Sequence, residues 1–254
     1  MVHFVGAGPG AKDLITVRGL SYIREADVII YAGSLVNPEL LKEAKSQCSI
    51  YDSAYMTLEE VLDVMYAAEA EGLMTVRLHT GDPSIYGAIR EQMDELSKKG
   101  ISYDVCPGVS SMSGAAASLR AEYTLPEVSQ SIIITRAEGR TKVPSGEELS
   151  KMAAHHATMI LFLSSGLAKK VKEDLMAGGY EPDTPTAVVY KATWQEEKII
   201  RTVLERLPEE MEREGIHKTA LIIVGNVLDG AYEKSKLYDK TFTTEFRKGK
   251  EEGI

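Results

Sequence analysis

Three short segments with a strand pattern in the first half of the chain each lead into a turn of glycine, proline and small polar residues. The segments and their turns are Val2–Val5 with Gly6–Ala11, Met74–Arg77 with Leu78–Gly87, and Ser102–Cys106 with Pro107–Ser111. A strand followed by a turn and a helix is the unit of a parallel sheet, because a parallel crossover needs a long connection. The carboxyl ends of parallel strands meet at one sheet edge, where open α/β sheets bind ligands. The three turns therefore predict a ligand crevice at that edge.

The central turn has the residues of a strand-to-helix connection. Gly81 allows a positive φ or a close backbone approach. We expect Asp82 to be an N-cap and Pro83 to occupy a first helical position, ahead of the helical spacing in Ala88–Lys98. A crossover helix without any ligand would carry the same signals. The presence of two similar turns elsewhere in the chain favours the functional interpretation.

The first turn, Gly6–Ala11, satisfies the pattern G-x-G-x-x-A and raises the question of a dinucleotide site. Two features argue against a nicotinamide cofactor. The helix begins later than in that fingerprint, with Thr16 as the expected N-cap of Val17–Glu25. The second strand, Asp27–Tyr31, ends without the acidic residue that would hold a ribose. Two interpretations of this turn remain: a glycine loop that binds another ligand, and a tight turn without a ligand.

Strand and helix patterns alternate through both halves, which predicts two α/β domains with mainly parallel sheets. We place an N-terminal α/β domain at 1–117, a linker at 118–130, and a C-terminal α/β domain with a charged tail at 131–254. A cleft between the two domains is the expected small-molecule site. Further strands are predicted at Ser49–Tyr51, Ser131–Thr135, Thr158–Leu163, Pro185–Tyr190 and Thr219–Val224, and an antiparallel strand is predicted at Ile199–Leu204.

Two segments have the capping-box pattern of a helix start, Thr57–Glu60 and Ser145–Glu148. After the first box, helical spacing predicts a buried stripe of Val61, Leu62, Met65 and Ala68.

Composition restricts the partners and the compartment. The 254 residues carry a net charge of -9, which argues against a broad nucleic-acid surface but not against an anionic small molecule. Cys48 and Cys106 form no CxxC or zinc pattern and indicate a reducing compartment. No secretory signal and no apolar run of membrane length is visible. We expect a cytoplasmic protein with no membrane or nucleic-acid partner and no protein-bound metal.

Two features near the predicted strand ends have competing interpretations. The cationic loop Arg136–Lys142 is either a solvated surface or a grip for an anion. His79 precedes the central turn and could serve as a general base, although a strand-end histidine satisfied by hydrogen bonds is the preferred interpretation.

The ordered set of turns resembles the tetrapyrrole (corrin/porphyrin) methylase family. The matching motifs are Val5–Gly10 with Asp13–Gly19, Thr80–Pro83 with Tyr86–Gly87, and Pro107–Ser111. They occur in the family's order, and the likeness continues to about Leu228. Further matches favour the branch that methylates precorrin-4 or its cobalt form, and they are Tyr31–Val36, Glu122–Glu127 with Ser129–Ser131, Thr135–Arg136, Gly139–Thr141 and Tyr190–Trp194.

The resemblance implies methyl transfer from S-adenosylmethionine to carbon 11 of the macrocycle in cobalamin synthesis, with S-adenosylhomocysteine as product, and a homodimer. The implied donor contacts are Pro9, Thr80, Gly81, Asp82, Ile85, Ser110, Ser111, Leu163 and Ala192, with Ala220 and Leu221 in addition. The macrocycle carries carboxylates, and the basic residues expected to pair with them are Arg120, Arg136, Arg140 and Lys142. Ala32 stands where related uroporphyrinogen methyltransferases carry an acid, so no catalytic acid can be assigned.

Two other functions are compatible with the same motifs. Some members of the superfamily methylate protein or ribosomal RNA, although the acidic balance disfavours RNA. A nucleotide-binding module that reads a ligand without turnover is the alternative from a different class. The sequence does not determine whether the macrocycle already carries cobalt, and the resemblance slightly favours the cobalt-containing substrate.

Overall fold

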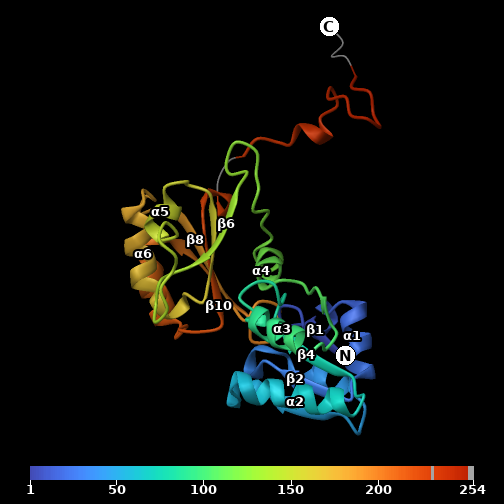
Figure 1. The fold of residues 1–254 in the computed structure, drawn as a ribbon. Coiled ribbons are helices and arrows are strands. Elements are labelled where there is room, and N and C mark those ends of the chain that lie inside the picture. Colours follow the sequence, from blue (N-terminus) through green and yellow to red (C-terminus); the bar gives the residue numbers. More distant parts are fainter. Residues whose placement is uncertain (230–231, 251–254) are drawn as a thin grey trace. The chain divides into compact units, whose positions relative to one another are not determined.

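A computed structural model describes residues 1–229 and 232–250, which form two compact units (Figure 1). Unit 1 contains Met1–Leu119 together with the short segment Val189–Lys198. Unit 2 contains Arg120–Val188 and the chain from Ile199 onward. Residues 230–231 and 251–254 of the predicted charged tail lie outside the described residues. The sequence-based division placed all of 189–198 in the second domain, whereas its contacts group it with unit 1.

Unit 1 is built on a five-stranded sheet in the order β3-β2-β4-β1-β5. Its strands are β1 (Val2–Gly6), β2 (Val28–Tyr31), β3 (Ser49–Asp52), β4 (Thr75–His79) and β5 (Tyr103–Cys106). All four pairings are parallel, as predicted for this half of the chain. Parallel sheets need cover on both faces, and unit 1 provides it with helices.

Apolar side chains from alternate strand positions form a core on each face of the unit 1 sheet. On one face Val5 and Ile29 pack with Ile23 of α1 (Val17–Glu25). On the other face Phe4 packs with Met65 of α2 (Leu58–Ala70), and Leu96 of α3 (Ile89–Lys98) belongs to the same cluster. The alternation arises because successive side chains of a strand point to opposite faces.

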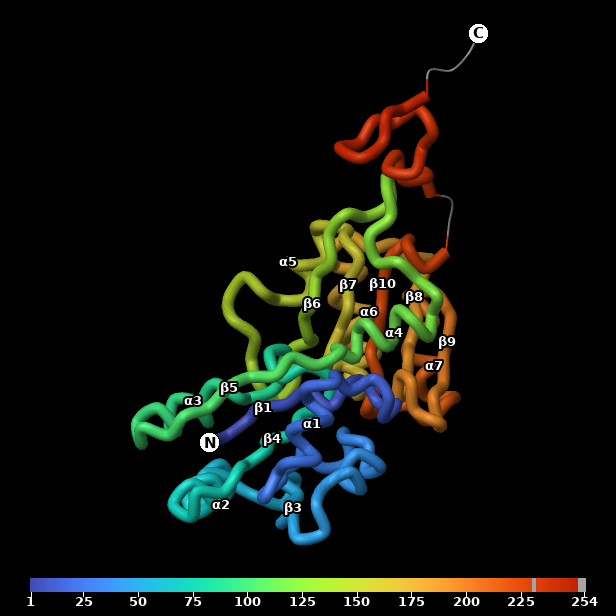
Figure 2. Tube along the Cα trace, turned by 90° about the vertical axis from the view of Figure 1, so that its right-hand side faces the viewer, coloured from blue at the N-terminus to red at the C-terminus, as the bar shows by residue number. Residues whose placement is uncertain are grey.

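Unit 2 is built on a second five-stranded sheet in the order β6-β7-β10-β8-β9, and Figure 2 shows β6, β7, β10 and β8 side by side. Its strands are β6 (Ile132–Arg136), β7 (Thr158–Phe162), β8 (Pro185–Tyr190), β9 (Lys198–Val203) and β10 (Ala220–Val224). β6 pairs with β7 in parallel, but β10 pairs with β7 in the antiparallel direction. The second sheet is therefore mixed.

The remaining regular elements are α4 (Ser111–Leu119), α5 (Leu149–Ala153), α6 (Ala168–Ala177), α7 (Leu207–Arg213) and short 3-10 turns. These turns cover Lys12–Leu14, Gly33–Leu35, Pro38–Glu43, Ser53–Tyr55, Ser165–Leu167, Leu204–Arg206, Asn226–Leu228 and Lys236–Tyr238. In the described part of the chain, no helix has the length and apolarity to cross a membrane.

The two predicted capping boxes have different outcomes. In the first, the Thr57 hydroxyl accepts a hydrogen bond from Glu60 N, and the Glu60 carboxylate accepts one from Thr57 N. The four residues of the predicted stripe are the buried residues of α2. The second box is wrong, because α5 begins only after Glu148, which makes no side-chain cap. Gly146 has a φ of 99°, which is not helical, so a helix cannot start at Ser145.

Candidate functional site

The first and central turns of unit 1 are joined through their backbones. Ala7 N donates to His79 O at 2.7 Å, directly beyond the β1–β4 pairing. Gly8 N donates to Gly81 O at 3.3 Å, and Gly81 N donates to Gly8 O at 2.8 Å. The two predicted ligand turns therefore extend the sheet past its last regular residue.

The third turn packs against the other two without side chains in between. A Cβ built on Gly108 would lie 2.2 Å from Gly81 O, and one on Gly6 would lie 2.6 Å from Gly108 Cα. Both distances are well inside van der Waals contact, so glycine is required at these two positions. The turns after β1, β4 and β5 thus meet at one edge of the sheet, as the sequence predicted.

Asp82 does not cap a helix, which corrects the sequence-based expectation. Its Oδ1 accepts from Ser84 N at 2.9 Å, and its Oδ2 accepts from Gly108 N at 2.8 Å. The helix α3 starts later, after Ala88, because Tyr86 and Ala88 have positive φ values of 55° and 50° that interrupt it. Asp82 instead ties the central turn to the third turn.

Hydrogen bonds keep the Asp82 carboxylate charged. Partial burial opposes ionisation, but the bonds from Ser84 and from Gly108 N outweigh it and lower the pKa of Asp82. Ile85 is half-buried and follows in the same turn.

The third turn leads into α4, whose first residue is Ser111. Ser110 is buried, and its Oγ accepts from Met112 N at 3.4 Å. The hydroxyls of Thr80 and Ser111 have no hydrogen-bond partner among residues 1–229 and 232–250. Oriented hydroxyls and backbone groups that lack partners at a strand edge are what a polar ligand would use.

The segment Val189–Lys198 also contacts the first turn, although it lies far along the sequence. Trp194 Nε1 donates to Pro9 O at 3.1 Å, and Ala11 N donates to Thr193 Oγ1 at 3.0 Å. Ala192, a predicted donor contact, is buried in this segment. Sequence reasoning missed these contacts, and its one signal was the family match at Tyr190–Trp194.

His79 lies at the end of β4 with only 4% of its surface exposed. The expectation that hydrogen bonds satisfy it is wrong for one ring nitrogen, because Nε2 is buried without a partner in the described part of the chain. Burial, reinforced by the positive charge of Arg77, lowers the pKa of His79 to about 3. A histidine that stays neutral and buried is not placed to accept a proton from a substrate.

The residues of unit 2 that are predicted to contact the methyl donor, Leu163, Ala220 and Leu221, lie at one edge of its sheet. Leu163 directly follows β7, is 67% exposed and has a φ of 52°. Ala220 and Leu221 begin β10, which runs antiparallel to β7, so the start of β10 lies beside the end of β7.

The predicted substrate cations differ in what they bind. The Arg136 guanidinium donates to Ala137 O at 3.3 Å, Thr141 O at 3.1 Å and Lys142 O at 2.7 Å. It therefore organises its own loop. The side chains of Arg120, Arg140 and Lys142 are exposed and pair with no other described residue.

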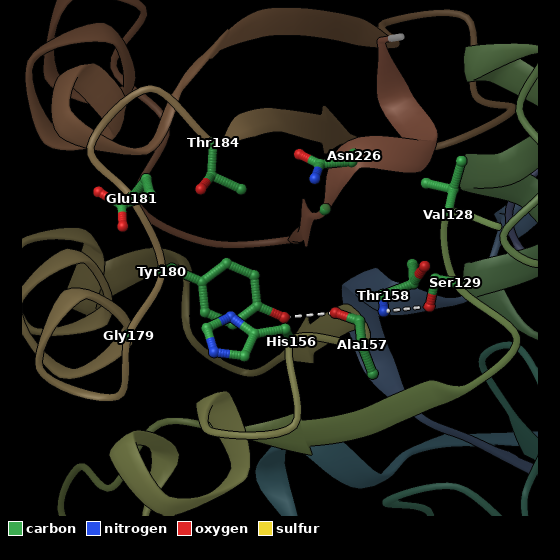
Figure 3. A pocket seen from close by; sticks show the side chains of 11 residues that line it. Val128, Ser129, His156, Ala157, Thr158, Gly179, Tyr180, Glu181, Thr184 and Asn226 are labelled. Carbon is green, nitrogen blue, oxygen red and sulfur yellow. Dashed lines mark hydrogen bonds between the residues drawn. The ribbon is translucent and has the colours of Figure 1, made fainter. Parts of the chain in front are cut away.

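Unit 2 also contains a cavity of about 180 Å³ at the opposite edge of its sheet (Figure 3). Its wall includes Thr158 at the start of β7 and Gly225 after β10, and Tyr180 donates to Ala157 O there. No predicted site residue lines this cavity, and its described wall includes Glu181 but neither lysine nor arginine. The cavity does not suit a polycarboxylate substrate.

In the described residues, no three His, Cys, Asp or Glu side chains are grouped as a metal would require.

Comparison with known proteins agrees with this architecture. The model of the tetrapyrrole (corrin/porphyrin) methylases matches residues 1–208. The chain belongs to this family. Its relatives described in the next paragraph are named as methyltransferases, so the protein is an enzyme.

More particular similarities concern one branch of the family. The chain is 57% identical over 248 residues to the cobalt-precorrin-4 C(11)-methyltransferase of Methanocaldococcus jannaschii, covering 97% of this chain and 96% of that protein. It is 43% identical over 248 residues to the precorrin-4 C(11)-methyltransferase of a Sinorhizobium species, covering 97% and 98%. The X-ray structure of the cobalt-precorrin-4 methyltransferase CbiF matches with a TM-score of 0.88 and 48% identity, covering 90% of this chain and 96% of that one.

Proposed function

We propose that the protein transfers a methyl group from S-adenosylmethionine to carbon 11 of cobalt-precorrin-4 in cobalamin biosynthesis. The observation that carries this proposal is the end-to-end match to a methyltransferase of that name. Identity is higher to this relative, at 57%, than to the precorrin-4 relative, at 43%, which favours the cobalt-containing substrate.

The edge of unit 1 fits the methyl donor. Three turns meet there backbone to backbone, and the hydroxyls of Thr80 and Ser111 remain available within the described chain. When bound, S-adenosylmethionine supplies an electrophilic methyl group on a sulfonium. The residues of unit 1 that would hold it are Pro9, Thr80, Gly81, Asp82, Ile85, Ser110, Ser111 and Ala192, and the contacts expected of Leu163, Ala220 and Leu221 stay predictions.

The protein's part in such a displacement is orientation rather than acid–base chemistry. Methyl transfer is in-line, and holding the reacting groups in line removes much of its barrier. Asp82 contributes by fixing the central turn to the third one, since its carboxylate accepts from Gly108 N at 2.8 Å. The two backbone hydrogen bonds between Gly8 and Gly81 fix the first turn to the central one. No described residue is assigned as the base for any proton that the methylated macrocycle releases.

We expect Arg140, Lys142 and Arg120 to pair with macrocycle carboxylates, because their charges are free of other described partners. Arg140→Gln should raise the KM for the macrocycle about fivefold with little change in kcat, as the loss of one charge-assisted bond predicts. Arg136→Gln should lower the melting temperature instead, because three loop carbonyls lose their donor. Steady-state kinetics and thermal unfolding measure the two effects.

Lys169→Gln provides the control, because Lys169 lies on the exposed face of α6 with its side chain 82% exposed. An unchanged KM in both Arg140→Gln and Lys142→Gln would contradict the assignment of the loop to substrate binding.

The test of the whole proposal is methyl transfer from labelled S-adenosylmethionine to cobalt-precorrin-4 and to metal-free precorrin-4 in parallel. Calorimetry against S-adenosylhomocysteine, with NAD as control, examines the donor site separately. Donor binding without transfer to either macrocycle would indicate a different acceptor, such as protein or RNA, or a binding module. Preference for NAD would refute the donor assignment.

A further inference from the structure

The segment Val189–Lys198, which we call the strap, belongs to unit 1 although both neighbouring stretches of sequence belong to unit 2. Two of its residues, Lys191 and Thr193, have positive φ values of 46° and 70°. Neither is glycine, so this backbone is strained and has to be held by its contacts.

Contacts from outside the sheet fix the second half of the first turn. Gly8 is paired with Gly81 of the central turn, but from Pro9 onward the sheet provides no partner. The polar partners here are side chains, because Trp194 Nε1 donates to Pro9 O at 3.1 Å and Asn37 Nδ2 donates to Gly10 O at 2.8 Å. The Thr193 hydroxyl accepts from Ala11 N at 3.0 Å.

The indole of Trp194 also lies directly against Gly10. A Cβ at position 10 would lie 2.0 Å from Trp194 Cδ1. Gly114 of α4 is equally close to the turn, because a Cβ there would lie 2.7 Å from Pro9 Cβ and 3.4 Å from Thr193 Cγ2. The Pro9–Gly10 pair is therefore packed against both the strap and α4.

Glu197 anchors the strap at its far end. Its Oε2 accepts from Thr193 N at 2.6 Å and from Ser118 Oγ of α4 at 2.5 Å. One carboxylate thus links the strained part of the strap to the same helix that supports Pro9.

We propose that the strap sets the affinity for the methyl donor, with Trp194 as the positioning residue that holds Pro9 and Gly10 in their binding conformation. This inference rests on the donor site proposed above. Pro9 and Ala192 are both proposed donor contacts, and Trp194 connects their two segments without itself being assigned to the donor.

The chain contains a single tryptophan, so tryptophan fluorescence reports on the surroundings of Trp194, which include Pro9 and the Lys191 ammonium. Excitation at a wavelength selective for tryptophan, during titration with S-adenosylhomocysteine, should change the emission of Trp194 along the same curve that calorimetry gives. A free-protein emission spectrum typical of a fully water-exposed indole would contradict the contact of Trp194 with Pro9 and Gly10.

Variants separate positioning from general stability. Trp194→Phe removes the N–H donor but keeps an aromatic ring, and we expect the Kd for S-adenosylhomocysteine to rise about fivefold. The KM for the macrocycle should change much less. Lys169→Gln is again the control, since Lys169 is on α6 of unit 2, outside the strap, with its side chain 82% exposed. Equal donor affinity in wild type and Trp194→Phe would refute the role of the strap.

A double-mutant cycle tests the contact itself. Gly10→Ala should weaken donor binding because its methyl group displaces the indole, whereas the same change added to Trp194→Ala should cost little further affinity. Independent, additive losses would contradict direct coupling. If the wild-type protein does not bind S-adenosylhomocysteine at all, the donor site fails; if it binds and these variants bind equally well, only the strap inference fails.

Discussion

At the scale of single residues, the least expected feature is the pair of buried basic side chains on β4. Arg77 is 7% exposed and donates to Ile30 O at 3.1 Å and to Gln92 Oε1 at 3.2 Å. Burial lowers the pKa of Arg77 to about 10 and that of His79 to about 3. The protein therefore keeps one charge and one neutral imidazole close together under the central turn.

The neutral state of His79 gives unfolding a defined pH dependence. Its pKa is about 3 when folded and near 6.5 when unfolded, so between these values only the unfolded chain binds the proton. The stability is complete above about pH 6.5 and is lost as the pH falls, by up to about 1.4 kcal/mol per pH unit. His79→Phe should flatten this dependence, as urea unfolding at a series of pH values would measure.

His155→Phe is a suitable control because His155 is exposed. Identical slopes in wild type and His79→Phe would show that His79 does not remain neutral on acidification.

Gly108 tests the backbone contact between the turns. Gly108→Ala places a methyl group 2.2 Å from Gly81 O and should lower the free energy of unfolding by more than about 2 kcal/mol. Gly100→Ala should cost only about 1 kcal/mol, because Gly100 has a φ of 69° but open space around it. Chemical denaturation of both variants gives the comparison, and equal losses would argue against a tight contact at Gly108.

Residue roles were predictable from sequence only where the partner is nearby. Thr16 was assigned as an N-cap, and it accepts from Gly19 N as predicted. Asp82 has the local signature of a cap, but its Oδ2 instead accepts from Gly108 N, 26 positions away. A carboxylate has several lone pairs, and sequence cannot show which distant N–H will reach one of them.

At the scale of elements, α2 and α5 show what a capping pattern does and does not determine. Both segments have a Ser or Thr followed three residues later by Glu, but only Thr57 caps a helix. We expect Thr57→Ala to lower the free energy of unfolding by about 1 kcal/mol and Ser145→Ala to change it by less than about 0.5 kcal/mol. Denaturant titration would measure both, and equal effects would contradict the distinction.

Helices and strands were the most predictable level because each depends on a short repeating pattern. The 3.6-residue period identified the buried stripe of α2, whose four predicted residues are the buried ones. The direction of β10 was not predictable in the same way. A strand pattern has no direction of its own, so the antiparallel pairing with β7 depends on the path of the connecting chain.

At the scale of the whole molecule, we expect a homodimer, because the family resemblance implies one. Sedimentation at micromolar concentration should give twice the chain mass of 27.8 kDa. A species of 27.8 kDa across that range would contradict the expectation.

The division into units was only partly predictable. The change near residues 118–130 has a local signal in its loss of periodicity, and unit 2 begins at Arg120. The assignment of 189–198 to unit 1 has no local signal in the sequence, because it depends on contacts such as that of Trp194 with Pro9, 185 positions away. The cleft expected between the domains stays a prediction.

The strap also determines when unit 1 can be completed. Chains are synthesised from the amino terminus, and domains generally fold as they emerge. A nascent chain that ends at Leu119 contains every strand of the unit 1 sheet but leaves the Pro9 carbonyl and the Ala11 amide without their partners. The hydrogen bonds of Pro9 and Ala11 can therefore form only after the chain beyond β8, including Thr193 and Trp194, has been synthesised. We expect a nascent enzyme to gain its sheet early and its donor site late.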